Sequence, residues 1–257
     1  MELGRQKVGR KSSSPLSDRC RAIILGSLLG DGSLKLYQPY QNARFSFRHS
    51  ANQKEYFLWK VQELKEISAN ADTWEQVDRQ GFGKAKLRYQ SAALPELTVL
   101  YRLTYKRGKL RVRRKWLNQL TPLSLCVWWL DDGSLLNGRQ GVLCTDGLSY
   151  KDLLTIVRYF RVVWGLHPRI GRVARTGPRS QQYRLWFRSV EELKKFLRII
   201  LPHVPVPSML RKVLLLYRDP ELQQRWISEV VQATGFDEEL VKRLVEERKQ
   251  ELARFRE

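Results

Sequence analysis

The sequence predicts an α+β fold made of two pseudo-symmetric repeats, each with the element order αββαββα. The first observation is an apolar helical run that ends in an acid followed by Gly-Ser. It occurs at residues 24–33 (ILGSLLGDGS) and again at residues 125–134 (LCVWWLDDGS). The second observation is that strand-like alternation and helical spacing follow both runs in the same order. Asp31 and Asp132 therefore hold the same place in two copies of one unit.

The first repeat is predicted to span residues 17–104. Residues 1–16 before it are basic and rich in serine, which predicts a flexible arm. Ser17 is the expected N-cap of the first helix, which the Gly-Ser pair then ends. The later elements of this repeat are strands around a turn within 33–49, a helix at 52–67, strands at 73–79 and 85–91, and a helix at 94–104.

The second repeat is predicted to span residues 121–218, after a basic linker at 105–120. Thr121 is its expected N-cap, because Pro122 suits the first helical position. The remaining elements are a strand at 141–145, a helix at 149–164, strands at 168–175 and 182–188, and a helix at 190–201. Residues 219–257 have no counterpart in the first repeat and predict a helical C-terminal tail, with Asp237 as an N-cap.

The net charge of +21 over 257 residues predicts a polyanionic partner. Nucleic acid is the leading candidate. An anionic membrane surface is the weaker one, because no long basic amphipathic helix stands out. The alternative without a partner is a basic surface that is simply solvated.

Cysteine and hydropathy patterns exclude several other classes. The three cysteines share no CxxC spacing, so neither a disulfide framework nor a zinc site is expected. No apolar run is long enough to span a membrane, and the N-terminus lacks the apolar core of a secretion signal. We therefore expect a reducing compartment, cytoplasmic or organellar, and no membrane partner.

The two repeated acids point to a metal. A carboxylate at a helix C-terminus faces the negative end of the helix dipole, which costs about 0.3–1 kcal/mol. Gly26, Ser27 and Cys126 are small enough to let two parallel helices approach, which would bring Asp31 and Asp132 together. A divalent cation between them would offset the cost, because hard cations prefer carboxylate oxygens. The alternative is a pair of core helices whose last acids are only solvated.

Each repeat also supplies one lysine at a similar distance after its acid, Lys109 in the first and Lys212 in the second. A lysine near a metal-bound phosphate can stabilise developing charge or help to polarise a water. The alternative is a phosphate contact without a chemical role. That alternative weighs more for Lys109, which lies within a basic run.

The predicted hairpins carry side chains that suit DNA. Arg, Lys, Gln and Asn pair with base edges in the major groove, where a β-ribbon fits. The predicted DNA-binding residues are Lys35, Tyr37, Gln41, Asn42, Arg44, Arg48, Arg139, Gln140, Arg169, Arg172, Arg175, Arg179, Gln181 and Arg184. For each of them a solvated strand face is the alternative.

The two motifs resemble those of LAGLIDADG homing endonucleases of the single-chain, two-repeat type. ILGSLLGDG and LCVWWLDDG are similar to the family's signature helix, and the flanking segments 120–125 (LTPLSL) and 206–212 (VPSMLRK) resemble family landmarks. The resemblance covers residues 17–217. It implies paired LAGLIDADG helices at the interface of the repeats and two antiparallel, saddle-shaped sheets.

The resemblance also implies site roles and an activity. The last acid of each motif, Asp31 and Asp132, would bind Mg²⁺, with Mn²⁺ as a substitute, and Lys109 and Lys212 would be the basic residues beside them. The usual proline near Lys109 is missing, and Asp146 stands where the family often has Gln. The implied activity is site-specific double-strand cleavage of DNA in intron or intein homing, by a monomer. The alternatives are an intron-splicing maturase that binds intron RNA and a DNA-binding protein without cleavage.

Overall fold

The computed structural model describes residues 15–76, 85–173 and 182–254, and it confirms the predicted α+β class. The first repeat consists of α1 (Asp18–Ser27), β1 (Gly32–Lys35), β2 (Arg44–Ser50), α2 (Lys54–Glu63), β3 (Ser68–Gln76), β4 (Lys86–Ser91) and α3 (Pro95–Thr104). The second repeat consists of α5 (Pro122–Asp132), β7 (Gly133–Leu136), β8 (Gln140–Leu143), α6 (Tyr150–Tyr159), β9 (Arg169–Val173), β10 (Gln182–Phe187) and α7 (Val190–Ile200). Both repeats therefore have the predicted order αββαββα.

The connector and the tail add elements that the repeats lack. The connector contains β5 (Tyr105–Lys106), β6 (Lys109–Leu110) and α4 (Arg114–Leu117). The tail consists of α8 (Pro220–Thr234) and α9 (Glu238–Arg254). Short helical turns are η1 (Ala51–Gln53), η2 (Lys65–Ile67), η3 (Phe160–Trp164), η4 (Leu201–His203) and η5 (Pro207–Lys212). Asp237 accepts a 2.9 Å hydrogen bond from the backbone of Leu240, which confirms the predicted N-cap.

The two sheets have the same topology. Their strand orders are β1-β2-β4-β3 and β7-β8-β10-β9, and all neighbours are antiparallel. In β2, Phe45 and Phe47 are buried under the helices, whereas Arg44, Ser46 and Arg48 alternate onto the other face. Each sheet therefore has one helix-covered face and one open face.

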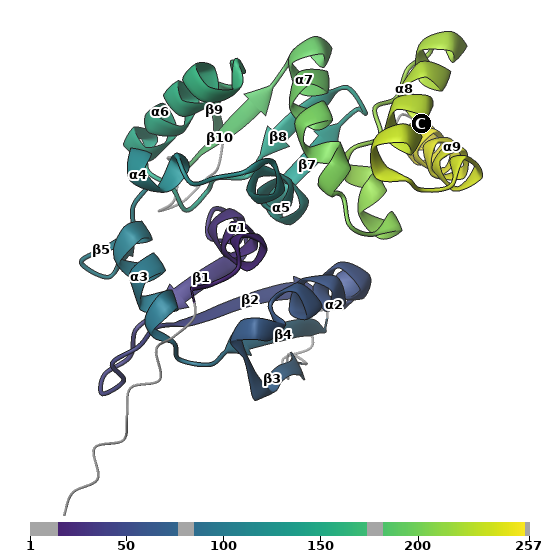
Figure 1. The fold of residues 1–257 in the computed structure, drawn as a ribbon. Coiled ribbons are helices and arrows are strands. Elements are labelled where there is room, and N and C mark those ends of the chain that lie inside the picture. The colour runs from purple at the N-terminus through teal and green to yellow at the C-terminus, as the bar shows by residue number, and fades with distance from the viewer. Residues whose placement is uncertain (1–14, 77–84, 174–181, 255–257) are drawn as a thin grey trace, which may run out of the picture.

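The helices α1 and α5 pack side by side between the two sheets (Figure 1). Gly26 permits this contact, because a Cβ atom there would lie 2.3 Å from the carbonyl oxygen of Ser124. Trp128 and Trp129 of α5 are buried in a core that both repeats share. Gly26, one of the predicted small residues, thus lies at the helix contact. Within the described residues, no helix combines the length and the apolar character needed to cross a membrane.

Candidate active site

The C-terminal ends of α1 and α5 meet at one place. The backbone N–H of Asp31, just past α1, donates a 3.3 Å hydrogen bond to Oδ2 of Asp131 in α5. Asp132 follows Asp131 directly and ends α5. Gly30 is required at this crossing, because a Cβ atom there would lie 2.6 Å from that of Asp131. The structure thus brings both predicted acids, Asp31 and Asp132, to the junction of the repeats.

The carboxyl group of Asp132 is harder to ionise than that of Asp31. Burial raises its pKa to about 7, and the negative charges of Asp31 and Asp131 add to this effect while Lys212 opposes it. No described residue donates a hydrogen bond to this carboxylate. Ionising Asp132 is therefore costly unless a cation arrives, which is the electrostatic signature of an acidic metal site.

The carboxyl group of Asp31 is stabilised by its neighbours instead. Burial alone would raise its pKa, but the interaction with His49 and the positive charges of Lys60 and Lys212 outweigh it, so the pKa lies below its ordinary value. His49 Nδ1 lies 3.3 Å from Oδ2 of Asp31, and the imidazole ring is buried. Asp31 is thus held in its ionised form by this chain's own residues.

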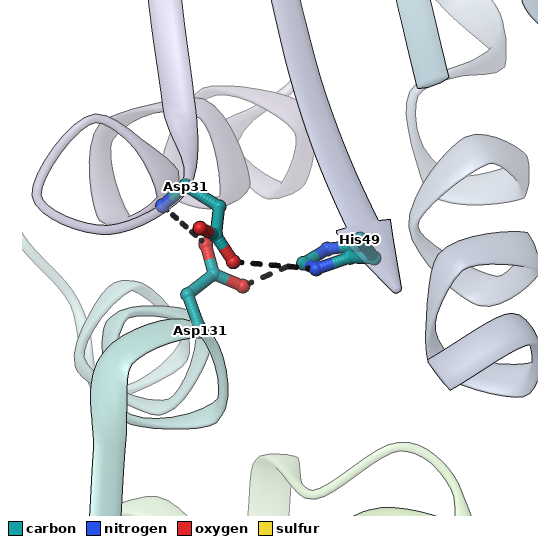
Figure 2. Close-up of side chains that lie close together, drawn as sticks. All are labelled: Asp31, His49 and Asp131. Carbon is teal, nitrogen blue, oxygen red and sulfur yellow. Dashed lines mark hydrogen bonds and ion pairs between the residues drawn. The ribbon is translucent and has the colours of Figure 1, made fainter. Parts of the chain in front are cut away.

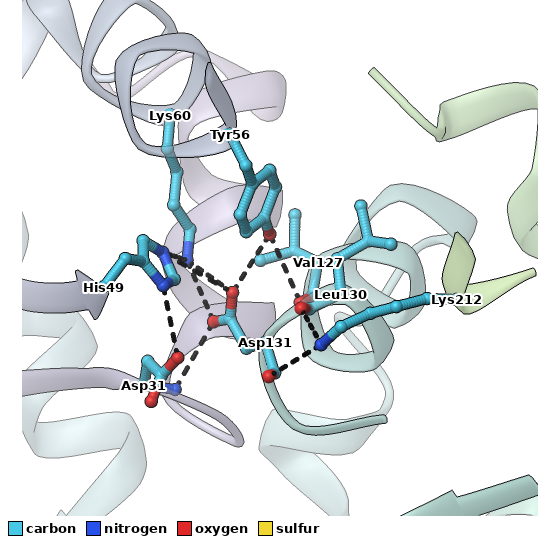
Figure 3. A network of polar contacts seen from close by, with 8 residues as sticks. All are labelled: Asp31, His49, Tyr56, Lys60, Val127, Leu130, Asp131 and Lys212. Atoms are coloured by element: carbon cyan, nitrogen blue, oxygen red, sulfur yellow. Dashed lines mark hydrogen bonds and ion pairs between the residues drawn. The ribbon is translucent and has the colours of Figure 1, made fainter. Parts of the chain in front are cut away.

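A buried network supports this arrangement (Figure 3). Nζ of Lys60 lies 2.8 and 2.9 Å from the two carboxylate oxygens of Asp131, and both side chains are fully buried. The hydroxyl of Tyr56 donates to Asp131 at 3.0 Å, and Lys60 also lies 3.5 Å from Nε2 of His49. Nε2 of His49 thus faces the ammonium of Lys60 and lies 3.9 Å from Oδ1 of Asp131, whereas Nδ1 faces the carboxylate of Asp31. Lys60 and Tyr56 come from α2, so the network joins α2 of the first repeat to α5 of the second.

Two donor sets for a metal can be compared. Atoms of Asp31, His49 and Asp131 lie within 4.8 Å of one another (Figure 2). The Asp131 carboxylate is already paired with Lys60, and a second cation there would face that ammonium. Among the described residues, no lysine or arginine forms an ion pair with Asp31 or Asp132, and the oxygen ligands that these two acids offer suit Mg²⁺. The residues present therefore fit a divalent metal at Asp31 and Asp132 better than at the His49 cluster.

Lys212 lies at the same place. It ends η5, and its ammonium donates to the carbonyl oxygens of Leu130 at 2.5 Å and Asp131 at 3.1 Å. Burial lowers its pKa, and the charges of Asp131, Asp31 and Asp132 act in the opposite direction. The structure therefore brings Lys212 to the two acids, as the sequence predicts.

Lys109 is placed differently. It lies in β6, where it pairs with Lys106 of β5, and it is exposed. The basic residues that influence the pKa of Asp31 are His49, Lys60 and Lys212, not Lys109. Lys109 and Lys212 follow their acids at similar distances along the chain, but they lie at different places in the structure. The reason is that the connector forms the β5–β6 hairpin, which the second repeat lacks. A catalytic role for Lys109 stays a prediction without support from the geometry.

The site roles of His49, Tyr56 and Lys60 were not predicted from the sequence. A signal for Lys60 was present, since it follows Tyr56 by one helical turn and so shares the apolar face of α2. A lysine on an apolar face needs a buried anion. Asp131, next to the predicted ligand, was the available candidate.

Residues 21–196 match the family model described as "LAGLIDADG DNA endonuclease family". The chain belongs to this family. The solved structure titled "The homing endonuclease I-WcaI bound to its DNA recognition sequence" has the same fold, with a TM-score of 0.69 and 18% identity. The match covers 84% of this chain and 97% of that one.

Two curated relatives of this chain are longer than the chain itself. Protein RecA of Mycolicibacterium fallax is 31% identical over 217 residues, which cover 79% of this chain and 48% of that protein. The cytochrome b mRNA maturase bI2 of Saccharomyces cerevisiae is 24% identical over 223 residues, covering 83% and 51% respectively. The chain thus spans about half the length of these relatives.

The open face of the first sheet in this LAGLIDADG protein carries several predicted DNA-binding residues. A hollow of about 340 Å³ is lined by Asp31 and by Lys35, Tyr37, Arg44 and Arg48. Gln41 is exposed in the loop after β1, and the side chain of Asn42 accepts a hydrogen bond from Thr98 instead of facing solvent freely. Residues of the same hollow that the sequence reasoning missed are Trp74, Arg88 and Gln90.

The open face of the second sheet is less uniform. Arg169 pairs with Trp186 across β9 and β10 on the open face, and Arg184 shares that face. Arg184 is bound to Asp146 by two 3.0 Å hydrogen bonds. Arg172 lies opposite Tyr183 and is exposed, but it points to the other face of the sheet from Arg169, because side chains alternate along a strand. Its role in DNA binding stays a prediction.

The remaining predicted contacts of the second repeat lie at or beyond the ends of its strands. Arg139 lies at the turn between β7 and β8, Gln140 is the first residue of β8, and both are exposed. Arg175, Arg179 and Gln181 fall outside the described residues.

Proposed function

We propose that the protein is a homing endonuclease that cuts both strands of duplex DNA at a long specific site. The observation that carries this proposal is the Asp31–Asp132 pair beside Lys212, at the junction of two sheets whose open faces bear basic side chains. Asp31 and Asp132 would hold Mg²⁺. When bound, the metal would supply a polarised water and charge stabilisation for phosphodiester hydrolysis.

The chain's own residues would position the reacting groups. His49 and the Asp131 network fix Asp31 from two sides, by its carboxylate and by its backbone N–H. Lys212 uses two of its three donors on backbone carbonyls, so one N–H remains available for a phosphate oxygen. The ammonium is thus held where negative charge develops during hydrolysis.

The comparisons support a nuclease of the homing type. The family model describes DNA endonucleases, and the similar I-WcaI structure is titled as bound to its DNA recognition sequence. Partial coverage of the RecA proteins is what we expect of an endonuclease unit carried within a host protein.

We further propose that the protein acts as a monomer. The two repeats of one chain supply both acids, so a second subunit is not needed to complete the site. Sedimentation at micromolar concentration should give one mass near 30.3 kDa, and an obligate dimer would contradict this proposal.

A maturase is the second candidate, because the chain is similar to the cytochrome b mRNA maturase bI2. Splicing assistance needs RNA binding, and it does not require a pair of metal-binding acids. Since both acids and Lys212 are in place, cleavage is the function that the site supports better.

The test is selection of cleaved molecules from a randomised duplex library. With Mg²⁺, and with Mn²⁺ as a substitute, we expect one family of long sites cut in both strands. In Ca²⁺ the same duplex should be bound but not cut, since Ca²⁺ prefers looser, higher coordination than Mg²⁺. Absence of cleavage together with tight binding to an intron RNA would favour the maturase.

A further inference from the structure

The hairpins at the ends of the two sheets differ in length. In the first repeat, β1 ends at Lys35 and β2 begins at Arg44, and the loop between them exposes Tyr37 and Tyr40. In the second repeat the strands are joined by a tight turn at Asn137 and Gly138, both with positive φ. The hairpin of the second sheet therefore extends less far than the hairpin of the first sheet.

The C-terminal part of the chain packs directly on this short turn. The backbone N–H of Leu216 donates a 2.9 Å hydrogen bond to the carbonyl oxygen of Gly138. A Cβ atom at Gly138 would lie 2.7 Å from Leu216, so glycine is needed both for the turn and for the contact. Figure 1 shows α8 and α9 beside the second repeat, with no counterpart beside the first sheet.

A basic cavity lies between the turn and the tail. Its volume is about 670 Å³, and four of its lining side chains are cationic, Arg139, Arg188, Arg218 and Lys249. No acidic side chain of the described residues lines it. Lys249 pairs with Glu246 at 2.9 Å, outside the lining, whereas Arg139 and Arg188 lie 6.0 Å from the rings of Tyr217 and Trp186. Guanidinium groups placed in this way suit phosphate oxygens.

The cavity continues the open face of the second sheet. Arg188 follows β10 and lies on the same side as Trp186 and Arg184, since side chains two positions apart share a face. Gln140, also in the lining, is on the open face of β8, opposite Leu136. A duplex that lies along the open face would therefore reach the cavity at the end of the sheet.

We propose that this cavity binds the sugar–phosphate backbone of duplex DNA outside the part read by the second sheet. The tail would thereby contact DNA beyond the end of the second sheet, as the long hairpin between β1 and β2 would beyond the end of the first sheet. This inference rests on the proposed function, because it assumes that DNA occupies the open faces.

The test compares two double variants of the full-length protein on the duplex recovered from the cleavage selection. Arg218→Gln/Lys249→Gln removes two cations of the cavity. Arg225→Gln/Arg243→Gln removes two exposed cations of α8 and α9 that do not line it. We expect the first variant to bind more weakly, with a salt dependence shallower by about two units in log K against log salt, and the control to match the unaltered protein.

Trimming the duplex assigns the contact to one end. Shortening one flank should weaken the unaltered protein and the control but not the cavity variant, whereas shortening the other flank should weaken all three alike. The inference would be overturned if the cavity variant and the control bound the trimmed duplexes equally well. It would also be overturned if the cavity variant lost RNA binding but kept its DNA binding. If the cavity variant melts early, Arg218→Gln alone is measured on the same trimmed duplexes. If the unaltered protein selects no duplex, the proposed function itself fails, which is a different result.

Discussion

The two halves of the molecule share their element order, but the surroundings of Asp31 and Asp132 shift the pKa values of the two acids in opposite directions. Asp31 is held through its carboxylate by His49 and through its backbone by Asp131, and its pKa lies below the ordinary value. Asp132 has no such support, and burial together with its acidic neighbours raises its pKa to about 7. The position that aligns with His49 in the second sheet is Thr145, whose hydroxyl donates to a backbone carbonyl.

The backbone therefore keeps the symmetry of the two repeats, whereas the side chains around the acids break it. The first repeat has Gly30 at the position where the second repeat has Asp131. A side chain at Gly30 would collide with Asp131, so only one of the two repeats can carry an acid at this position. The buried Lys60 of the first repeat then serves an acid of the second. A single chain permits such specialisation, because each half can change without the other.

Removing either metal-binding acid should have the largest effect. We expect Asp31→Asn and Asp132→Asn to lower double-strand cleavage by roughly 10³-fold or more, because each removes a charged ligand worth several kcal/mol to the reaction. Binding in Ca²⁺ should change little, since the basic side chains supply the affinity. Single-turnover cleavage beside filter binding measures both. A variant that cuts near the normal rate would place the metal elsewhere.

Breaking the buried pair should be the next largest effect. Lys60→Met leaves the fully buried Asp131 without its cation, so the free energy of unfolding should fall by about 3–5 kcal/mol. Adding Asp131→Asn should recover part of that loss, because the remaining amide carries no charge. Urea unfolding of the two variants and of Lys54→Met, an exposed lysine of α2, provides the comparison. Equal stability of Lys60→Met and Lys54→Met would show that the network does not stabilise the fold.

Lys212 tests chemistry separately from affinity. Lys212→Met should lower the cleavage rate by about 10²-fold, the scale of positioned charge and proton-transfer groups. Loss of one phosphate contact should weaken binding only modestly and alike on all sequences. Lys109→Met is the matched variant, and the exposed position of Lys109 predicts a smaller effect on the rate. Unchanged cleavage with weaker binding would make Lys212 a positioning residue.

The sequence was sufficient for the fold because its signals are local and repeated. The apolar run with its Asp-Gly-Ser ending and the changes from strand to helix period all lie within short windows, and they recur in order. The caps at Ser17, Thr121 and Asp237 are equally local, and each accepts the expected backbone hydrogen bond.

The finer site could not be derived in the same way, because its contacts join distant segments. The Lys60–Asp131 pair spans 71 positions and depends on how α2 meets α5. The placement of Lys109 depends on a two-stranded hairpin that spacing alone does not reveal. The face of Arg172 depends on where β9 begins, since a one-residue shift reverses every side chain.

The smallest effect, and the most direct test of asymmetry, concerns His49. His49→Phe keeps the ring that packs against Phe47 and Tyr56 but removes the contact with Asp31. Groups that orient a metal ligand are worth about 10- to 100-fold, so we expect a loss near the lower limit, because Asp131 still holds the backbone of Asp31. The loss should fall mainly on one DNA strand, the one cut nearer Asp31.

Duplexes labelled on either strand give the two nicking rates separately. Thr145→Val is the matched change in the second half and should leave the ratio of the two rates as it was. An equal slowing of both strands by His49→Phe would mean that the two acids act as one unit, and that the difference between the halves has no catalytic consequence.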